Sequence, residues 1–446
     1  MEGIRSRHGT PEARRDHGRR REGRHQRVDR RGHDHRGGIV PRSGLPCPRE
    51  HRAPKPDFLR CGVKIAQVSP WFFPHLGGVE SHVRSVSREL AARGHQVTVV
   101  TSRHDPSLPS EENLDGFRVV RVKPRLVVMR TPITPKMRAN LRSLPVDVVH
   151  AHSPPPLASH YAGAVAGERG TPYVVTYHCD VELPSVLGTL AESIYRRSLG
   201  ESTLRNAAQV IVTTRTYGAT SRAVWRYNPV VVPNAVDHRR FRPDVDGGAV
   251  RERLNIPREA PVALLVGRIV PHKGVEHFIE AARFVPDARF LVVGEGSLLE
   301  AMRRFAGTMG VADRVRFLGR VSDENLPKVY AACDVFVLPS VSRLEAFGIV
   351  ALEAMATAKP VIVADIPGVR EVIEDGREGL LADPMNARDL AEKIRRLLGD
   401  PEARHVMGER GREKVLASFG IERVTDQIES VYRAVLGPRT GPTSRP

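Results

Sequence analysis

The residues best suited to chemistry are two glutamates, Glu345 and Glu353, which flank an apolar, Ala-rich segment. This segment, from Ile349 to Met355, holds neither Gly nor Pro, so it predicts a packed helix. The preceding run from Asp334 to Leu338 predicts a buried strand. Glu345 would stand just before the helix start, where it can hold sugar hydroxyls, and Glu353 two turns further on, near a ribose. A helix with two ordinary glutamates is the alternative.

The start of this predicted helix is a candidate anion site. The first N–H groups of a helix have no partner within it and carry about half a positive elementary charge, so a diphosphate can dock there without a metal. The donor-binding residues that this predicts are Phe347, Gly348, Ile349 and Val350.

A second predicted strand, Ala263 to Val270, runs into the turn Pro271-His272-Lys273-Gly274. Arg268 and Lys273 would project from the carboxyl edge of a parallel sheet, which is where open α/β sheets bind ligands. Arg offers a planar fork for phosphate oxygens and Lys a point charge, so the pair suits a departing nucleotide diphosphate. Two solvated surface cations are the alternative interpretation.

A glycine pair, Gly77 and Gly78, separates the predicted strand Val63 to Ser69 from the predicted helix Val79 to Arg93. Because glycine has no Cβ, the backbone there can come close to a phosphate or a sugar. A tight turn without any ligand would require the same residues. Glu80, at the start of this helix, is a candidate for the acceptor side.

Two histidines, His150 and His152, lie in the predicted strand Val146 to His152. Side chains alternate along a strand, so both rings point to the same face. They fit satisfied core or surface histidines, and they also fit a pair of metal ligands. No third ligand is evident in the sequence, so no metal site is predicted.

Taken together, these pieces resemble the family 4 retaining glycosyltransferases of the GT-B type. The resemblance covers nearly everything from Val63 to Leu436, and the joint order of the pieces is more specific than any one of them. In chain order the matching segments are Gly77-Gly78-Val79-Glu80, Asp147-Val148-Val149-His150-Ala151-His152, Val232-Pro233-Asn234-Ala235-Val236-Asp237, Val266-Gly267-Arg268 with Lys273-Gly274, Val293-Gly294-Glu295-Gly296, Phe317-Leu318-Gly319, and Glu345 with Glu353.

The resemblance implies an activity and a set of catalytic residues. It implies transfer of a sugar from a UDP- or GDP-sugar to a hydroxyl of a lipid or glycan, with retention at the anomeric carbon and no metal. Arg268, Lys273 and the helix start near Phe347 would stabilise the departing diphosphate, while Glu345 holds sugar hydroxyls. His152 would contact the transferred sugar near its reactive carbon, and His150 would be structural.

The resemblance also implies supporting contacts. Arg320 and Val321 would support the nucleotide base, mainly through backbone groups. His178 and Asp180, which follow the predicted strand Pro172 to Tyr177, would contact the acceptor. The alternatives are a sugar-nucleotide epimerase of the same architecture and, more remotely, a basic nucleic-acid-binding protein, whose affinity would fall steeply with salt.

The expected fold class is α/β, with two Rossmann-like, doubly wound parallel sheets, because strands and helices alternate throughout. Residues 63–235 are predicted to form an acceptor domain and residues 240–420 a nucleotide-sugar-binding domain. The closing segment, Ile421 to Leu436, carries a helical apolar stripe. By resemblance, this last helix (residues 421–437) folds back onto the first domain. The other predicted strands are Gln96 to Thr101, Val210 to Thr214, Arg289 to Val293, Val315 to Gly319, Pro360 to Ala364 and Gly379 to Ala382.

Length and composition agree with two domains in the cytoplasm. The 446 residues exceed the roughly 250 to 300 that one core serves. No run of about 18 apolar residues spans a bilayer, and no apolar signal segment is present. The scattered Cys47, Cys61, Cys179 and Cys333 predict neither a disulfide framework nor a zinc site.

The formal charge of +18 is unevenly distributed, because residues 1–62 hold 17 Lys and Arg against 8 Asp and Glu. This extension shows no strand or helix periodicity and is predicted to be disordered. A basic arm can contact nucleic acid, and His33 and His35 could take up a stray metal, although neither role is expected here. A further hypothesis is that residues 1–62 are not translated in the cell, with Val63 encoded by an alternative start codon.

Two short patterns argue against cofactors. Asp244-Val245-Asp246 resembles the metal-binding triplet of a different glycosyltransferase fold, but it lies in a polar linker and is predicted to be solvated. Gly294-Glu295-Gly296 has Leu299 where a dinucleotide fingerprint needs its third glycine, so a hydride-transfer cofactor is not expected.

A basic and apolar segment, Val122 to Leu144, is a candidate for peripheral contact with an anionic membrane. A solvated loop beside a partly buried strand is the equal alternative. The cations are Lys123, Arg125, Arg130, Lys136, Arg138 and Arg142, and the apolar residues are Leu126, Val127, Val128 and Met129.

Overall fold

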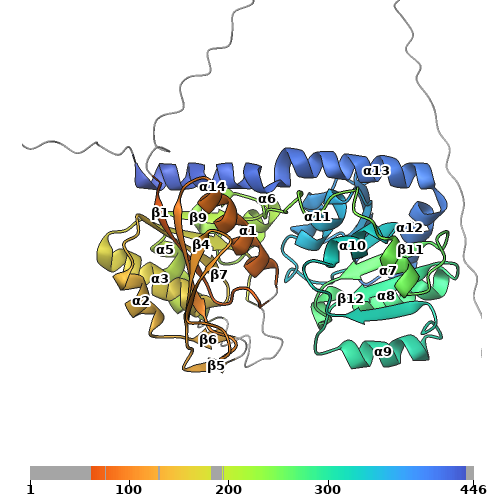
Figure 1. The fold of residues 1–446 in the computed structure, drawn as a ribbon, viewed down its shortest axis with the longest axis horizontal. Coiled ribbons are helices and arrows are strands. Elements are labelled where there is room, and N and C mark those ends of the chain that lie inside the picture. Colours follow the sequence, from red (N-terminus) through yellow and green to blue (C-terminus); the bar gives the residue numbers. More distant parts are fainter. Residues whose placement is uncertain (1–61, 76, 129–130, 182–192, 194, 438–446) are drawn as a thin grey trace, which may run out of the picture. The chain divides into compact units, whose positions relative to one another are not determined.

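A computed structural model describes residues 62–437 apart from 76, 129–130, 182–192 and 194. The basic extension and the hypothesis about its translation therefore lie outside the described residues, as do Arg130 and Met129. Within the described chain, the alternation of strands and helices produces two mainly parallel sheets (Figure 1).

The first sheet has the strand order β10-β9-β8-β7-β1-β2-β4-β3, and only the β3–β4 pair is antiparallel. All five strands predicted for this half are present. β3, β4 and β10 were not predicted, although Asp115-Gly116 between β3 and β4 has the positive φ values of a hairpin turn. The bounds are β1 Lys64–Ser69, β2 Gln96–Ser102, β3 Glu111–Leu114, β4 Phe117–Val122, β7 Val148–Ser153, β8 Tyr173–Tyr177, β9 Gln209–Val212 and β10 Val230–Val231.

Both faces of this sheet are covered, which is why its strands read as nearly continuous apolar runs. On one face, Val97 and Val99 of β2 join the core under α1 (Gly78–Ala92) and α14 (Ile421–Leu436). On the other, Val100 of the same strand faces α2 (Met137–Ser143) and α3 (Pro156–Arg169). A separate two-stranded hairpin, β5 (Leu126–Val128) with β6 (Thr131–Ile133), belongs to neither large sheet.

The second sheet is entirely parallel, with the order β13-β12-β11-β14-β15-β16. In chain order this is 3-2-1-4-5-6, the doubly wound arrangement, whose direction reverses between β11 and β14. The bounds are β11 Val262–Val266, β12 Arg289–Val293, β13 Val315–Gly319, β14 Val335–Leu338, β15 Val361–Ala364 and β16 Gly379–Ala382.

The predicted strand Ala263 to Val270 was too long. β11 ends at Val266, not at Val270, because Gly267 has a φ of 155° and a 3-10 turn, η4 (Pro271–Lys273), follows. Arg268 therefore lies in the loop after the strand. This loop and the one after β14 flank the point where the strand order reverses, which is where such sheets bind ligands.

The helices of this half cover both faces of the second sheet, and two separate apolar clusters lie beneath them. Figure 1 shows α11 and α13 on one side and α8 and α9 on the other. The bounds are α7 Gly248–Arg253, α8 Val275–Ala281, α9 Leu299–Thr308, α10 Leu326–Ala331, α11 Ile349–Ala356, α12 Ala387–Gly399 and α13 Pro401–Lys414.

The chain returns to the first sheet at its C-terminal end. After α13 a π-helical turn, η7 (Val415–Phe419), leads into α14, whose residues Ile421, Val424, Ile428 and Tyr432 are buried in the core shared with α1. The expected return of the last helix to the first sheet is confirmed. No helix among the described residues is both long and apolar enough to cross a membrane.

Candidate functional site

The centre of the candidate site is an ion pair between Lys273 and Glu345. Lys273 follows β11 and Glu345 follows β14, so both stand beside the reversal point of the second sheet. The Lys273 ammonium donates a hydrogen bond to Oε2 of Glu345, and the Ser340 hydroxyl lies 3.4 Å from the same oxygen. Both charged side chains are largely buried, with 13% and 12% of their surfaces exposed. The structure thus brings together two residues that the sequence separates by about seventy positions.

Electrostatics keep the Glu345 carboxylate ionised. Burial alone would raise the pKa of this carboxyl, because a charge is costly to desolvate. The Lys273 ammonium outweighs that effect through its charge and its hydrogen bond, with further help from His272 and Ser340, so the pKa is lowered. Glu345 is therefore a fixed acceptor for hydroxyl groups near a cation.

Gly274 explains how the two loops come so close. Its φ of 62° lies in the left-handed region, and a Cβ there would stand 2.0 Å from the carbonyl oxygen of Pro339. A hydrogen bond of 3.0 Å from the N–H of Val341 to the carbonyl of His272 ties the loops together. Only glycine fits this position, which is the physical reason for the Lys-Gly pair.

The start of α11 leaves backbone donors free, and its role as an anion site stays a prediction. Gly348 precedes the helix with a φ of 86°, and the first helical bond runs from the N–H of Ala351 to its carbonyl. Within the described chain, the N–H groups of Gly348, Ile349 and Val350 have no protein acceptor. Phe347 is buried, with its ring 5.9 Å from that of Phe419, and anchors the turn. The free donors and the helix dipole favour a negatively charged group here.

The glycine pair of the first half lies against this helix start. A Cβ on Gly78 would stand 3.3 Å from the Cδ1 atom of Ile349, so the two predicted phosphate-binding elements are neighbours. At Gly77, a Cβ would lie 2.3 Å from the Glu80 carboxylate. Glu80 in turn lies 3.0 Å from Nδ1 of His75. Glu80 is thus held beside the glycine pair, and its contact with an acceptor stays a prediction.

Two predicted arginines lie at the surface. Arg268 is exposed in the loop after β11. Arg320 follows β13 and donates to the carbonyl of Pro74 at 3.3 Å, while Val321 packs against the apolar core of the second sheet. Their roles with a diphosphate and a base stay predictions.

Glu353 lies on α11 and is hydrogen bonded by Tyr330. The Tyr330 hydroxyl donates to Oε2 of Glu353 at 2.7 Å. Burial raises the pKa of Glu353 to about 7, although the Tyr330 bond and the charge of Arg240 oppose this shift. Asp323 adds to it. The carboxyl group of Glu353 therefore gains or loses its charge near neutral pH.

The two predicted histidines belong to a buried polar cluster. His150 bonds to the Tyr432 hydroxyl and to Thr176, both at 2.7 Å. His152 bonds to Gln67 at 2.9 Å and to His178 at 3.0 Å. Both ring nitrogens of His152 are therefore engaged within the protein, and its contact with a sugar stays a prediction.

Asp180 connects the first half to the loop before Glu345. One carboxylate oxygen accepts from the hydroxyls of Tyr177 at 3.1 Å and Ser221 at 2.6 Å. The other lies 3.8 Å from the guanidinium of Arg343. Arg343 was not singled out from the sequence, because one more arginine in a basic chain carries no signal. Gln67, which contacts His152, could have been singled out from the sequence, because it is a polar residue within the otherwise apolar strand β1.

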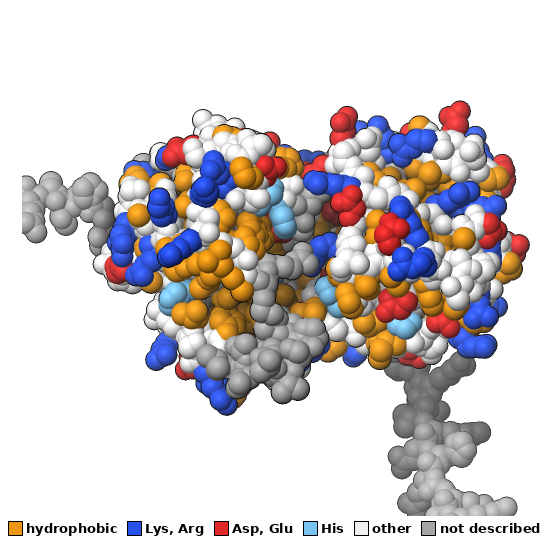
Figure 2. Space-filling view, turned by 90° about the horizontal axis from the view of Figure 1, so that it is seen from below, with side chains coloured by type: hydrophobic (Ala, Val, Ile, Leu, Met, Phe, Trp, Pro, Cys, Tyr) orange, Lys and Arg blue, Asp and Glu red, His pale blue; other side chains and the backbone are white. Residues whose placement is uncertain are grey.

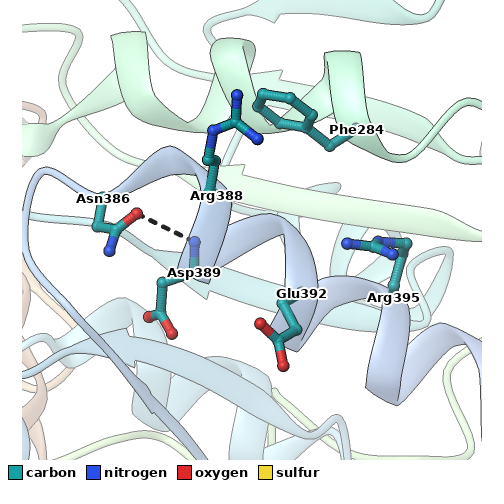
Figure 3. Close-up of a pocket in the computed structure, with 6 residues that line it drawn as sticks. All are labelled: Phe284, Asn386, Arg388, Asp389, Glu392 and Arg395. Atoms are coloured by element: carbon teal, nitrogen blue, oxygen red, sulfur yellow. Dashed lines mark hydrogen bonds between the residues drawn. The ribbon is translucent and has the colours of Figure 1, made fainter.

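Two other features do not contribute to this site. The exposed Asp244 pairs with Arg242, Asp246 accepts the N–H of Gly248, and no group of three metal-ligating side chains is found in the part of the chain that the structure describes. A surface hollow at the start of α12 is shown in Figure 3. It is lined by residues such as Asn386, which caps that helix, and Arg388, which lies over Phe284, and it includes none of the site residues.

Comparison with known proteins agrees with this geometry. Residues 76–240 match the model described as Glycosyltransferase Family 4, and residues 248–414 match Glycosyl transferases group 1. A GDP-mannose-dependent alpha-(1-6)-phosphatidylinositol monomannoside mannosyltransferase of Mycolicibacterium smegmatis is 30% identical, over 78% of this chain and 92% of that protein. A D-inositol 3-phosphate glycosyltransferase of Acidothermus cellulolyticus is 33% identical, over 83% and 88%.

The solved structures define the same class. Sucrose-phosphate synthase from Thermosynechococcus elongatus aligns with a TM-score of 0.71 and 27% identity, over 84% of this chain and 99% of that one. The family matches and the fold together define a glycosyltransferase with the GT-B fold. The chain belongs to the group 1 glycosyl transferases of family 4, and it transfers sugars from nucleotide sugars.

Proposed function

We propose that this enzyme moves a hexose or N-acetylhexosamine from a UDP- or GDP-sugar to a hydroxyl of a lipid or glycan, with retention and without a metal. The observation that carries the proposal is the Lys273–Glu345 pair beside the start of α11. A cation and free helix donors suit a diphosphate, while an ionised carboxylate beside them suits sugar hydroxyls. The predicted division into domains at residues 63–235 and 240–420 is part of this proposal.

The proposed mechanism places charge stabilisation on the leaving group. The bond between the anomeric carbon and the phosphate oxygen breaks, and the acceptor oxygen bonds to that carbon from the same face. The acceptor proton passes to the departing phosphate oxygen. Lys273, Arg268 and the N–H groups of Gly348 to Val350 would offset the negative charge that grows on the diphosphate. Glu345 would hold the sugar while this happens.

The acceptor that we propose carries a cyclitol such as inositol, most simply in a lipid headgroup. The support comes from the names of two relatives, one acting on a phosphatidylinositol mannoside and the other on an inositol phosphate. A panel of nucleotide sugars with inositol phosphate and phosphatidylinositol vesicles tests this. If the enzyme transfers sugar to neither of these acceptors but does transfer it to a glycan without inositol, the proposed acceptor class is refuted and the enzyme class stands.

The β5–β6 hairpin supports contact with an anionic membrane. Leu126, Val127 and Val128 of β5 are 44%, 51% and 46% exposed, and the neighbouring Lys123 and Arg125 are also exposed. Figure 2, seen from the side on which Figure 1 draws this hairpin, shows hydrophobic side chains next to Lys and Arg. Exposed apolar residues beside cations fit the interface of an anionic bilayer.

The basic part of this surface is smaller than the sequence suggested. Arg138 and Arg142 both bond to Glu168 of α3, at 2.9 and 2.7 Å, so their charges are already paired. We expect Val127→Glu to abolish flotation with vesicles that contain phosphatidylglycerol. Leu416→Glu, at another apolar residue with 46% exposure, is the matched control and should float normally. Equal loss in both variants would refute the hairpin as the contact.

The central experiment measures nucleotide binding and transfer in the presence of EDTA. We expect UDP or GDP to bind, and transfer to continue, without any divalent ion. Lys273→Ala and Glu345→Ala should each remove transfer while a normal far-UV dichroism spectrum shows a retained fold. Near-normal turnover in both would contradict the proposal. The alternative, a sugar-nucleotide epimerase, would change the donor when no acceptor is present, and product analysis without acceptor separates the two.

A further inference from the structure

Arg121 of β4 is a buried cation whose hydrogen-bonding groups are only partly used. Its side chain is 1% exposed. Nη2 donates to the carbonyl of Phe73 at 2.9 Å and to the carboxylate of Glu112. Nε and Nη1 are also buried, and neither has a hydrogen-bond partner among the described residues. Unmatched N–H groups on a buried guanidinium are costly, so they point to a ligand that supplies acceptors.

Two further buried groups without partners lie next to these donors. Thr101 of β2 is the Cα partner of Arg121 in the parallel β2–β4 pair, so the two side chains lie on the same face of the sheet. In the part of the chain that the structure describes, neither the Thr101 hydroxyl nor Nδ1 of His104 has a hydrogen-bond partner. We call these groups, Nε and Nη1 of Arg121, Oγ1 of Thr101 and Nδ1 of His104, the polar floor.

Aromatic rings border the polar floor. The His104 ring lies 5.5 Å from the ring of His75 and 6.3 Å from that of Trp71. The rings of Trp71 and His75 are stacked, with 5.7 Å between their centroids. All three residues are partly exposed, whereas Arg121 is buried. The floor is therefore the buried side of an aromatic surface that solvent reaches.

The charges around the floor favour a neutral ligand over an anion. Burial lowers the pKa of His104, and the charges of His75 and Arg121 lower it further, while Asp105 and Glu80 oppose this shift. Arg121 is paired through Nη2 with a third carboxylate. A phosphate placed on the floor would meet repulsion from these carboxylates, whereas a hydroxyl group would not.

We propose that the polar floor and Trp71 bind a neutral polyhydroxylated ring, a sugar or a cyclitol, that belongs to the acceptor. Ring hydroxyls both donate and accept, so they match guanidinium N–H groups as well as an imidazole nitrogen. The C–H face of the ring can pack on the indole, which is a large and rigid apolar surface. His75 lies 3.0 Å from Glu80, which stands beside Gly77, so this subsite adjoins the glycine pair.

This inference deepens the proposed function and rests on it only in assigning the ring to the acceptor. Binding can be measured without transfer, by tryptophan fluorescence, because the sequence contains just Trp71 and Trp225. Trp225 lies in η3 (Trp225–Tyr227) and is 61% exposed. Trp225→Phe therefore reports on Trp71, and Trp71→Phe is the matched control.

The probes are myo-inositol, methyl α-mannopyranoside and inorganic phosphate. We expect at least one of the two ring compounds to change the emission of Trp225→Phe, and neither to change that of Trp71→Phe. No response of Trp225→Phe to either ring, an equal response in both variants, or a response to phosphate alone would overturn the subsite. If the rings fail to bind while the wild type still transfers sugar, the subsite is wrong and the proposed function stands.

Thr101→Val tests the floor without an expected loss of fold. Valine has the shape of threonine, and the hydroxyl that it removes has no partner in the described structure, so the free energy of unfolding should not fall. In the Trp225→Phe background, affinity for the ring that responds should fall roughly tenfold, the value of one hydrogen bond. Unchanged affinity would contradict a role of this hydroxyl in ring binding and overturn the floor as defined.

Arg121→Met and Glu112→Gln separate ligand binding from the ion pair. Both variants break the same pair, but only the first removes the N–H donors of the floor. We expect ring affinity to fall at least roughly tenfold in Arg121→Met and by less than about twofold in Glu112→Gln. Arg118→Met is the surface control, because Arg118 forms an exposed pair with Glu111 on the same strand. Equal losses in Arg121→Met and Glu112→Gln would show that Arg121 serves the ion pair alone.

Discussion

The Tyr330 hydroxyl donates a hydrogen bond of 2.7 Å to the Glu353 carboxylate, joining α10 to α11 inside the second half of the chain. Burial nevertheless raises the pKa of Glu353 to about 7. A helix that was expected only to carry a ribose-binding carboxylate therefore also carries a group that titrates near neutral pH.

We expect donor affinity to depend on pH through Glu353. An ionised carboxylate accepts hydrogen bonds at both oxygens and more strongly than a protonated carboxyl does, so the KM for the nucleotide sugar should rise as the pH falls through about 7. Glu353→Gln should have a raised KM that no longer changes between pH 6 and 8. The measurement is the pH profile of KM for both proteins. A wild-type KM that is flat across this range would remove Glu353 from ribose binding.

The same pKa predicts an effect on stability. The folded-state pKa lies above the usual value, so the stability that Glu353 contributes is present below its unfolded pKa and is lost as the pH rises through about 7. Glu353→Gln should therefore raise the free energy of unfolding at pH 8 by roughly 1 to 2 kcal/mol, with little gain at pH 5, after allowance for partial exposure. Urea titrations at both pH values check this, and a gain that is equal at both would contradict it.

Breaking the Lys273–Glu345 pair should destabilise the fold, because it leaves a buried carboxylate without its cation. We expect Lys273→Met to lower the free energy of unfolding at pH 7 by about 3 kcal/mol. The double variant Lys273→Met with Glu345→Gln should recover most of this loss. The pKa of Glu345 is lowered in the folded protein. The loss of stability caused by Lys273→Met should therefore shrink as the pH falls below the pKa of an ordinary carboxyl. Urea denaturation of the single and double variants measures the coupling, and additive effects would contradict it.

Gly274→Ala should disrupt the site through the backbone. The added Cβ would meet the Pro339 carbonyl, and the positive φ would add strain, so we expect a loss of roughly 2 kcal/mol or more and a large fall in transfer. Gly307→Ala is the control, because its Cβ would meet nothing within 4 Å and it lies inside α9. That change should stabilise the protein by about 0.5 to 1 kcal/mol. Thermal unfolding and initial rates compare the two, and equal behaviour would be inconsistent with the loop geometry.

Glu429 anchors the return helix to the first sheet. Its carboxylate lies 3.1 Å from Nε2 of His95 and 3.3 Å from the guanidinium of Arg93. We expect Glu429→Ala to lower the free energy of unfolding by roughly 2 to 3 kcal/mol, because His95 and Arg93 lose a buried partner. Asp426→Ala, which removes an exposed partner of the same Arg93, should cost less than about 1 kcal/mol. Urea titration of both variants makes the comparison, and an equal loss would show that Glu429 is not the anchor.

Local pattern was enough for most of the fold. Apolar runs of four to seven residues between turn signals placed the strands of both sheets, because strands covered on both faces must be apolar throughout. The exceptions have local causes. β4 carries Arg118 and Arg121 among its valines, which hid the alternation, and the predicted end of β11 missed that the glycine after Val266 leaves the strand.

What the sequence by itself determined was the order of elements and the types of residue at the sheet edges: glycines before α1 and α11, cations after β11 and a glutamate after β14. These depend on neighbours along the chain, so they can be read from it. What only the tertiary structure decided was which distant side chains meet, such as Lys273 with Glu345 and Tyr432 with Gln67. Such pairs depend on strand order and on the path of the return helix, so they exist only once those elements have packed.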